Sequence, residues 1–311
     1  MRAEREPFPE SLSTASVVTA GKFDGVHLGH RAILEHTVLR ARELGVEAVA
    51  VTFDRNPSEF LRPEVSPRAL VGLERKLELI AETGIDLVAV LTFDERRAPQ
   101  PPEEVVDELF VGRLGARRVI VGADFRFGAG GLGDVRTLKR LGETRGYDVE
   151  LLPDVGGSGV ERISTSGIRA LIAEGRVSEA AARLGSLPAV TGEVVRGNAR
   201  GRELGFPTAN LSPDSIGAVP ADGVYAGWLL RGGDRTRLPA AISVSDNPTF
   251  STNDQRRVEA FVLDRDLDLY GETVTIEFVD RIRGIVRFDD VPSLVERMSA
   301  DVAEIRGVLG V

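Results

Sequence analysis

The chain has 311 residues, of which 42% are hydrophobic and 28% charged, a composition typical of a globular protein with two domains. Its net charge of −9 disfavours a nucleic-acid partner, and the lack of cysteine excludes disulfides, thiol nucleophiles, iron–sulfur clusters and cysteine zinc sites. The charged start MRAEREPFPE does not resemble a secretory signal, and no apolar run is long enough to span a membrane. We therefore expect a cytoplasmic enzyme with no membrane partner.

In the first half of the chain, apolar strand-like runs alternate with amphipathic helical runs. This alternation predicts an α/β domain with a doubly wound parallel sheet that helices cover on both faces. The expected strands are 15–20, 46–53, 85–93, 116–122 and 147–153, and the expected helices are 30–45, 73–84, 102–115 and 134–146.

From Thr191 onward, short strands separated by glycine-rich turns replace this pattern. Several such strands predict a small antiparallel β-barrel, and a C-terminal helix at 293–309 has an apolar face that can close the domain. We place the domains at residues 1–186 and 187–311. The expected barrel strands are 223–230, 238–245, 256–264 and 272–282.

Two of the three histidines, His27 and His30, lie in the stretch GKFDGVHLGH, between the first expected strand and the first helix. A helix N-terminus attracts anions, and two imidazoles there can donate hydrogen bonds to phosphate oxygens as charge develops in a transition state. The alternative is that both are turn residues without chemistry. The third histidine, His36, lies off the apolar stripe of its helix, so we expect it to be solvated at the surface.

Two other stretches of the first half have competing interpretations. The hydroxyls of ISTSGIR, at residues 163–169, precede a predicted helix and could cap it or bind phosphate. The sequence GAGGLG at 128–133 fits the dinucleotide fingerprint G-x-G-x-x-G. A true fingerprint directly follows a first strand, whereas this one lies several residues beyond its strand, so we expect a loop over a planar ligand instead.

The stretch GEVVRGNARGRELGFPTANL, at 192–211, is rich in glycine and small polar residues. Thr208 and Asn210 could supply hydroxyl and amide oxygens to Mg²⁺, and Gly201, Arg202 and Gly205 could close over phosphate. The alternative is a long surface loop, although long loops in compact domains tend to be functional.

A kinase without a Walker motif still needs a group that accepts the proton of the substrate hydroxyl. Glu259, in the expected strand 256–264, shares one strand face with Phe261 and Leu263. Apolar surroundings disfavour the charged form of a carboxylate, which suits such a group to accept a proton near neutral pH. The alternative is a structural glutamate in a salt bridge, for which Arg257 is the nearest candidate.

The motif H-x-G-H after a first strand resembles the nucleotidylyltransferase signature, in which two histidines stabilise the α-phosphate of ATP. The longer string GKFDGVHLGH is similar to the FMN adenylyltransferase half of bacterial bifunctional riboflavin kinase/FMN adenylyltransferases, also called FAD synthetases. RISTSGIR resembles that family's triphosphate motif, VGADFRFGAGGLGD its flavin-side loop, and VTFDRNPSEFL its second-strand motif, with Asn56 where histidine is frequent. The resemblance implies ATP or phosphate binding by Gly21, Phe23, Asp24, Gly25, Gly29, Ser164, Thr165, Ser166 and Arg169, and flavin binding by Asp124, Phe125 and Phe127.

In the second half, residues 197–210 resemble the riboflavin kinase signature G-x-x-x-G-R-x-L-G-F-P-T-A-N very closely. The resemblance implies a six-stranded antiparallel barrel and places the family's catalytic glutamate at Glu259. SVSDNPTF, at 243–250, resembles a flavin and nucleotide loop of the family but departs from it at Ser243, Ser245 and Asp246. The ATP- or flavin-binding residues so implied are Gly201, Arg202, Gly205, Pro207, Asn247 and Thr249, and the metal ligands are Thr208 and Asn210.

The resemblance predicts a bifunctional enzyme of FAD synthesis with Mg²⁺ as cofactor. The C-terminal domain would phosphorylate riboflavin to FMN with ATP, and the N-terminal domain would adenylylate FMN to FAD and release pyrophosphate. The sequence is compatible with a homo-oligomer. Two alternatives stay open, a chain that retains only one activity and a non-catalytic flavin- or nucleotide-binding protein. Retention of His27, His30 and Glu259 together argues against the second.

Overall fold

The computed structural model describes the chain apart from residues 154–162, 198–203, 233–235, 247–255 and 266. Its backbone contacts divide it into two compact units. The first unit comprises Met1–Pro67 and Leu73–Ser164, and the second comprises Arg68–Gly72 and Thr165–Val311. The expected α/β domain and antiparallel barrel are both confirmed.

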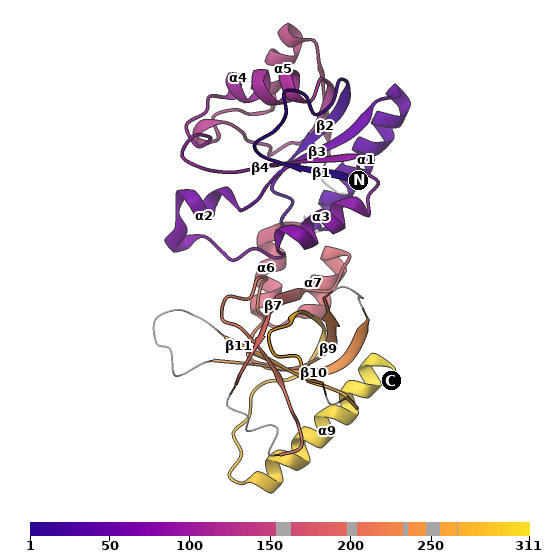
Figure 1. Ribbon diagram of the computed structural model, residues 1–311, viewed down its shortest axis with the longest axis vertical. Coiled ribbons are helices and arrows are strands. Elements are labelled where there is room, and N and C mark those ends of the chain that lie inside the picture. The colour runs from indigo at the N-terminus through magenta and orange to yellow at the C-terminus, as the bar shows by residue number, and fades with distance from the viewer. Residues whose placement is uncertain (154–162, 198–203, 233–235, 247–255, 266) are drawn as a thin grey trace. The chain divides into compact units, whose positions relative to one another are not determined.

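The first unit, in which Figure 1 labels β1 to β4, is built on a six-stranded sheet. Its strand order is β1-β4-β3-β2-β5-β6, and every pairing is parallel. Five of its strands were predicted, but β1 was not, because its residues RAER carry charges and no apolar alternation. The strands are β1 (Arg2–Arg5), β2 (Ser16–Ala20), β3 (Glu47–Phe53), β4 (Leu87–Leu91), β5 (Ala116–Gly122) and β6 (Asp148–Leu152).

Helices cover both faces of this sheet, because successive strand residues point to opposite sides. Val17 and Ala48 pack with α1 (Leu28–Leu44) and α3 (Leu73–Ala81). On the other face, Val18 and Val49 pack in a second cluster with residues of the segments 102–113 and 135–145. The first of these segments begins as an α-helix, α4, and continues with π-helical geometry as η3, and the second is α5. The bounds of these elements are α4 (Pro102–Val105), η3 (Val106–Arg113) and α5 (Val135–Arg145).

The strand order defines a topological switch point, which lies at the carboxyl ends of the strands. β2 lies in the middle, with β3 and β4 on one side and β5 and β6 on the other, so the chain reverses its direction of winding there. In open parallel sheets, ligands bind at such a switch point, outside the carboxyl ends of the strands. The residues that directly follow β2 and β5, from Gly21 and from Ala123, lie at this edge.

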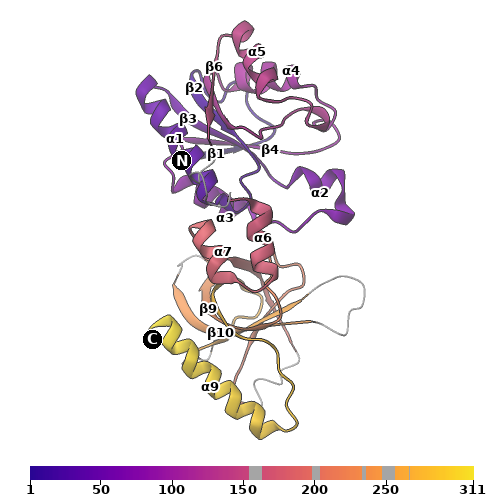
Figure 2. The ribbon, with the colours of Figure 1, turned by 180° about the vertical axis from the view of Figure 1, so that it is seen from behind.

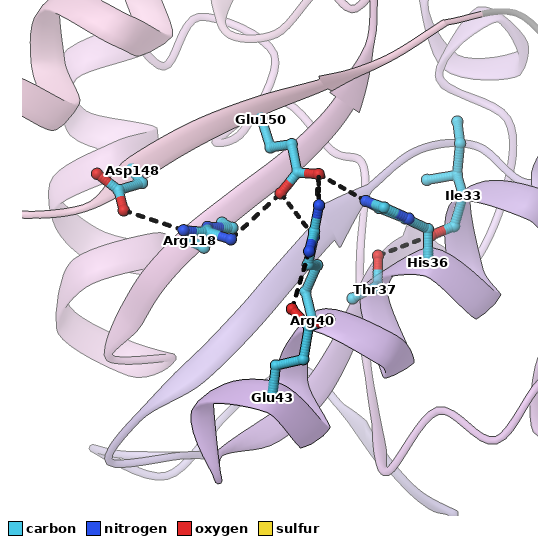
Figure 3. Close-up of polar contacts among 8 residues, drawn as sticks. All are labelled: Ile33, His36, Thr37, Arg40, Glu43, Arg118, Asp148 and Glu150. Carbon is cyan, nitrogen blue, oxygen red and sulfur yellow. Dashed lines mark hydrogen bonds and ion pairs between the residues drawn. The ribbon is translucent and has the colours of Figure 1, made fainter.

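His36 is not solvated as the sequence predicted. Its Nε2 atom lies 2.6 Å from Oε1 of Glu150, a residue of the edge strand β6. Figure 3 shows that Glu150 also accepts hydrogen bonds from Arg40 of α1 and Arg118 of β5. The prediction was wrong because the polar side of α1, which carries His36 and Arg40, lies against the charged residues of β5 and β6 and not against solvent alone.

The second unit contains a closed antiparallel barrel in the order β10-β11-β8-β7-β12-β9. Alternate residues of each strand fill its interior, among them Val190, Tyr225, Ile242 and Ile276. The strands are β7 (Ala189–Val195), β8 (Ala209–Leu211), β9 (Gly223–Arg231), β10 (Arg237–Ser245), β11 (Arg257–Val262) and β12 (Thr273–Arg283).

Three helices pack on the outside of the barrel. α6 (Thr165–Ala173) and α7 (Val177–Leu184) precede it in the chain, and Val177 belongs to the barrel's own core. The predicted C-terminal helix is α9 (Val291–Leu309), which lies along the barrel in Figure 2. Its Ile305 is fully buried against Ala226 and Leu263.

Candidate active sites

The loop after β2 has an unusual backbone that sets the position of the histidine pair. A short 3₁₀ turn, η1 (Asp24–Val26), follows Phe23. Phe23 and two residues of this turn, Gly25 and Val26, have positive φ angles of 47°, 79° and 42°. The side chains of Phe23 and Val26 are buried in the core below the sheet edge. Burial of these two apolar residues compensates for a conformation that costs free energy for any residue except glycine.

His27 is the N-cap of α1 and stacks on His30. Its Nδ1 atom accepts a hydrogen bond of 3.3 Å from the backbone N–H of His30, and the two ring centroids lie 3.6 Å apart with 14° between the planes. A ring nitrogen that accepts this bond carries no proton, so the neutral ring holds its hydrogen on Nε2. Nε2 is therefore the donor atom of the His27 ring, and it belongs to a helix N-terminus, a place that attracts anions.

His30 is held in an uncharged state by its surroundings. Burial lowers the pKa of His30 well below 6.5, and the charges of His27 and Lys76 lower it further. Its ring meets Phe23 edge to face with centroids 5.4 Å apart, and its Nδ1 has no hydrogen-bond partner among the described residues. A buried nitrogen without a partner costs free energy, which is consistent with a site that a ligand completes.

Lys76 of α3 is a residue of this site that the sequence analysis missed. Its side chain is buried, and Nζ donates to the backbone oxygens of Phe53 at 2.7 Å and of Lys22 at 3.4 Å. The available signal was its rarity, because the chain has only three lysines among 39 basic residues.

The expected flavin-side residues follow β5 at the same edge of the sheet. Asp124 is exposed, while the rings of Phe125 and Phe127 stack with centroids 5.5 Å apart. Phe127 is buried in the core and pairs with Gly133 across an isolated bridge, so the stretch GAGGLG closes on itself as a short loop. This geometry differs from the turn of a dinucleotide fingerprint, as the sequence predicted.

The motif ISTSGIR lies at the border between the two units. Ser164 ends the first unit and Thr165 begins α6, so Thr165 and Ser166 are in the first helical turn and do not precede it. Arg169 donates from Nε to the backbone oxygen of Arg68 at 3.3 Å.

Asn56, the departure from the family pattern, has a local structural role. It is the N-cap of the short helix α2 (Pro57–Leu61), where its side chain accepts a hydrogen bond of 3.2 Å from the N–H of Ser58.

Antiparallel pairing in the barrel brings the second set of site residues together. Glu259 of β11 lies directly opposite Asn210 of β8. The hydroxyl of Thr208 donates to Oε2 of Glu259 at 3.3 Å, and Arg257 donates to Oε1 at 3.4 Å. The salt bridge considered as an alternative is therefore present, in addition to the contact with Thr208.

Asn210 has a feature that fits a metal ligand. The residue is buried, its Nδ2 donates to the backbone and side-chain oxygens of Thr208, both at 3.3 Å, and its Oδ1 has no hydrogen-bond partner among the described residues. An unpartnered amide oxygen beside a hydroxyl suits Mg²⁺, which prefers oxygen ligands and keeps substrate phosphates and waters. In the described parts of the chain, no group of three or more histidines and carboxylates could hold a metal ion.

A pocket open to solvent adjoins these residues and includes Thr208 in its lining. Gly205, with φ of 85°, lies two residues before Pro207 on its rim. The pocket is lined by Val194, Pro207, Thr208, Ala209, Ala260, Val262, Arg265, Leu267, Leu269 and Tyr270. The other expected residues, Gly201, Arg202, Asn247 and Thr249, lie outside the described residues.

Comparison with known proteins gives a consistent result for both halves. Residues 10–167 match the family model for FAD synthetase, and residues 184–309 match that for riboflavin kinase. The bifunctional riboflavin kinase/FMN adenylyltransferase of Escherichia coli strain K12 is 34% identical over 294 residues, which cover 94% of this chain and 93% of that protein. The chain belongs to the bifunctional riboflavin kinase/FMN adenylyltransferase family.

A second relative and a solved structure are also similar over nearly the whole chain. The bifunctional riboflavin kinase/FMN adenylyltransferase of Bacillus subtilis strain 168 is 31% identical over 93% of this chain and 91% of that protein. The crystal structure of a macrolide-efflux protein from Streptococcus pneumoniae has a TM-score of 0.83 at 29% identity, covering 98% of this chain and 99% of that one. None of the helices in the described parts of this chain has the length and apolar character of a membrane span.

As a bifunctional riboflavin kinase/FMN adenylyltransferase, the chain makes FAD in two ATP-dependent steps, phosphorylation of riboflavin and adenylylation of FMN. The family and the function predicted from the motifs are confirmed, and the two alternatives are not favoured.

Proposed function

We propose that the histidine pair serves adenylyl transfer, and that Glu259, Thr208 and Asn210 serve phosphorylation of riboflavin. The observation that carries this proposal is that the barrel gathers a carboxylate and an amide around the hydroxyl of Thr208, which lines a pocket, while both histidines stand at the switch point of a different sheet. The oxygen of that amide has no hydrogen-bond partner among the described residues.

In the adenylyltransferase domain, an oxygen of the FMN phosphate attacks the α-phosphate of ATP, and pyrophosphate leaves. Charge accumulates on the α-phosphate oxygens during this step, and hydrogen-bond donors that are already oriented stabilise it most effectively. His27 and His30 supply such donors at the N-terminus of α1. Asp124, Phe125 and Phe127 hold the flavin side, and Ser164, Thr165, Ser166 and Arg169 bind the triphosphate.

In the kinase domain, the 5′-hydroxyl of riboflavin attacks the γ-phosphate of ATP and gives its proton to Glu259. Thr208 orients the carboxylate through its hydrogen bond of 3.3 Å. Thr208 and Asn210 would hold Mg²⁺, which when bound neutralises charge on the transferred phosphoryl group. The pocket beside them receives ATP, with Pro207 on its rim.

The proposed functional domains are residues 1–186 and 187–311. The family models support this division, since one ends at residue 167 and the other begins at residue 184. By contacts alone, α6 and α7 belong with the barrel, because α7 supplies Val177 to its core.

Incubation with riboflavin, ATP and Mg²⁺, followed by chromatography, tests the assignment of residues. The double change His27→Ala and His30→Ala should stop the reaction at FMN. Glu259→Ala should abolish FMN formation and leave adenylylation of added FMN intact. FAD formation by the double histidine variant at the wild-type rate would refute the assignment.

A further inference from the structure

A buried ammonium group contacts the loop that leads to the histidine pair, and neither half-reaction described above uses it. Lys76 has 8% of its surface exposed, whereas lysines are almost never fully buried unless paired. Its Nζ donates to the oxygen of Phe53 at 2.7 Å, to that of Lys22 at 3.4 Å, and to Oγ1 of Thr52 at 3.5 Å. These three acceptors match the three N–H donors of an ammonium group.

The three acceptors come from two different segments of the chain. Thr52 and Phe53 end β3, while Lys22 lies in the loop between β2 and His27. The hydroxyl of Thr52 also donates to the oxygen of Lys22 at 3.1 Å, so a small network joins the end of one strand to the loop of the next. Lys76 thereby fixes the loop from a third element, α3.

Neighbouring carboxylates favour the charged form of Lys76 and so oppose the effect of its burial. Burial lowers the pKa of Lys76, whereas the charges of Asp24, Asp54 and Glu59 act in the opposite direction. The positive charge of Lys76, like that of a protonated His27, lowers the pKa of His30 in addition to the effect of burial. A positive charge near an imidazole opposes its protonation, and it also favours a bound anion.

We propose that Lys76 is a positioning residue of the adenylyl-transfer site, which holds the loop of the histidine pair against the end of β3 and adds a positive charge to the surroundings of His30. The inference rests on the proposed role of the histidines. His30 stacks on His27 with ring centroids 3.6 Å apart, and burial disfavours the charged form of its imidazole. Without the ammonium, His30 gains protons at a higher pH and the loop loses an anchor.

The direct test is the titration of the imidazole signals by NMR in the full chain, which has only three histidines. In the wild type, we expect a midpoint for His30 well below 6.5, because burial lowers its pKa. In Lys76→Met it should move upward without reaching 6.5, because burial and His27 still act. Lys139→Met, which removes an exposed lysine of the same unit, is the matched control and should leave the midpoint unchanged.

Kinetics provide the second readout. Lys76→Met should lower kcat for FMN adenylylation roughly tenfold or more, with the greatest loss at acid pH, and should leave riboflavin phosphorylation by the same chain unchanged. Lys76→Arg, which keeps the charge, should restore the midpoint of His30 and part of kcat. Protonation of ATP affects all variants equally. Differences between variants in the pH dependence of kcat therefore come from groups of the protein.

Thr52→Val keeps the ammonium and removes the hydroxyl that links Lys76 to Lys22. This variant tests the positioning role if Lys76→Met does not fold. It should lower kcat without moving the midpoint of His30. Equal midpoints and equal kcat in the wild type and Lys76→Met, or wild-type kcat in Thr52→Val, would overturn the inference. A wild type that makes no FAD from FMN would instead refute the proposed function, while the NMR comparison would still decide whether Lys76 acts on His30.

Discussion

Asp301 of α9 accepts hydrogen bonds from both Nε and Nη2 of Arg283 in β12, at 3.0 and 2.6 Å. The carboxylate side chain is only 4% exposed, and Arg297 forms a second ion pair with it at 2.9 Å. This pair ties the C-terminal helix to the barrel, together with the buried Ile305.

Asp301→Asn should therefore destabilise the second unit strongly. Loss of one partner from a buried ion pair leaves the other charge uncompensated, which costs about 3–5 kcal/mol. Asp264→Asn is the matched control, because Asp264 also pairs with α9, through Arg306, but its side chain is 70% exposed. Exposed pairs contribute about 0–1 kcal/mol. Equal midpoints of the two variants in urea unfolding would contradict this interpretation.

Glu150 gives the first unit a pH-dependent stability. Burial acts to raise the pKa of Glu150, but hydrogen bonds from His36 and Arg40 and the charge of Arg40 outweigh it, so the pKa lies below 4.5. Because the folded pKa is depressed, the stabilisation is present above the unfolded value and is lost as the pH falls through the folded value.

Glu150→Gln should destabilise the protein by roughly 1–3 kcal/mol at neutral pH, and the difference from the wild type should shrink below pH 4.5. Urea unfolding at several pH values measures this. Glu43→Gln, which removes a half-exposed partner of Arg40 alone, should have a much smaller effect. A difference that persists unchanged into acid would exclude the carboxylate as its source.

Gly29→Ala should separate stability from adenylyl transfer. Alanine favours helical backbone over glycine, so we expect no loss of folding free energy. A Cβ at this position would lie 3.2 Å from the ring of His27, which must shift. Small displacements of reacting groups are costly, and FMN adenylylation should fall about tenfold. Thermal unfolding and the rate of FAD formation from FMN give the two values, and an unaltered rate would show that the ring position is not critical.

Asn210→Ala should impair only the kinase. The lost amide oxygen corresponds to about 1.5–3 kcal/mol, or roughly 10- to 100-fold in riboflavin phosphorylation at limiting Mg²⁺. Titration with Mg²⁺ should show that high concentrations restore part of the rate. Adenylylation of added FMN provides the internal control, and a kinase rate independent of this change would remove Asn210 from the metal site.

Local patterns in the sequence determined the architecture of both units. Apolar runs alternating with amphipathic helices sufficed for β2 to β6, and the pattern is clearest in β3 and β4, whose residues are buried on both faces of the sheet. The motifs also indicated His27, His30 and Glu259, because their spacing relative to a strand or a helix start is a local property. β1 was missed because its pairing with β4 depends on the backbone and leaves no trace in its charged side chains.

The tertiary structure alone decided the environment of each polar group. Lys76, His36 and Asn210 have the same sequence character as surface residues. Whether they are buried, paired or left without a partner depends on segments distant in the chain, such as β3 for Lys76 and β6 for His36. Burial and charge pairing are properties of the space around an atom, and that space is filled only when the chain has folded.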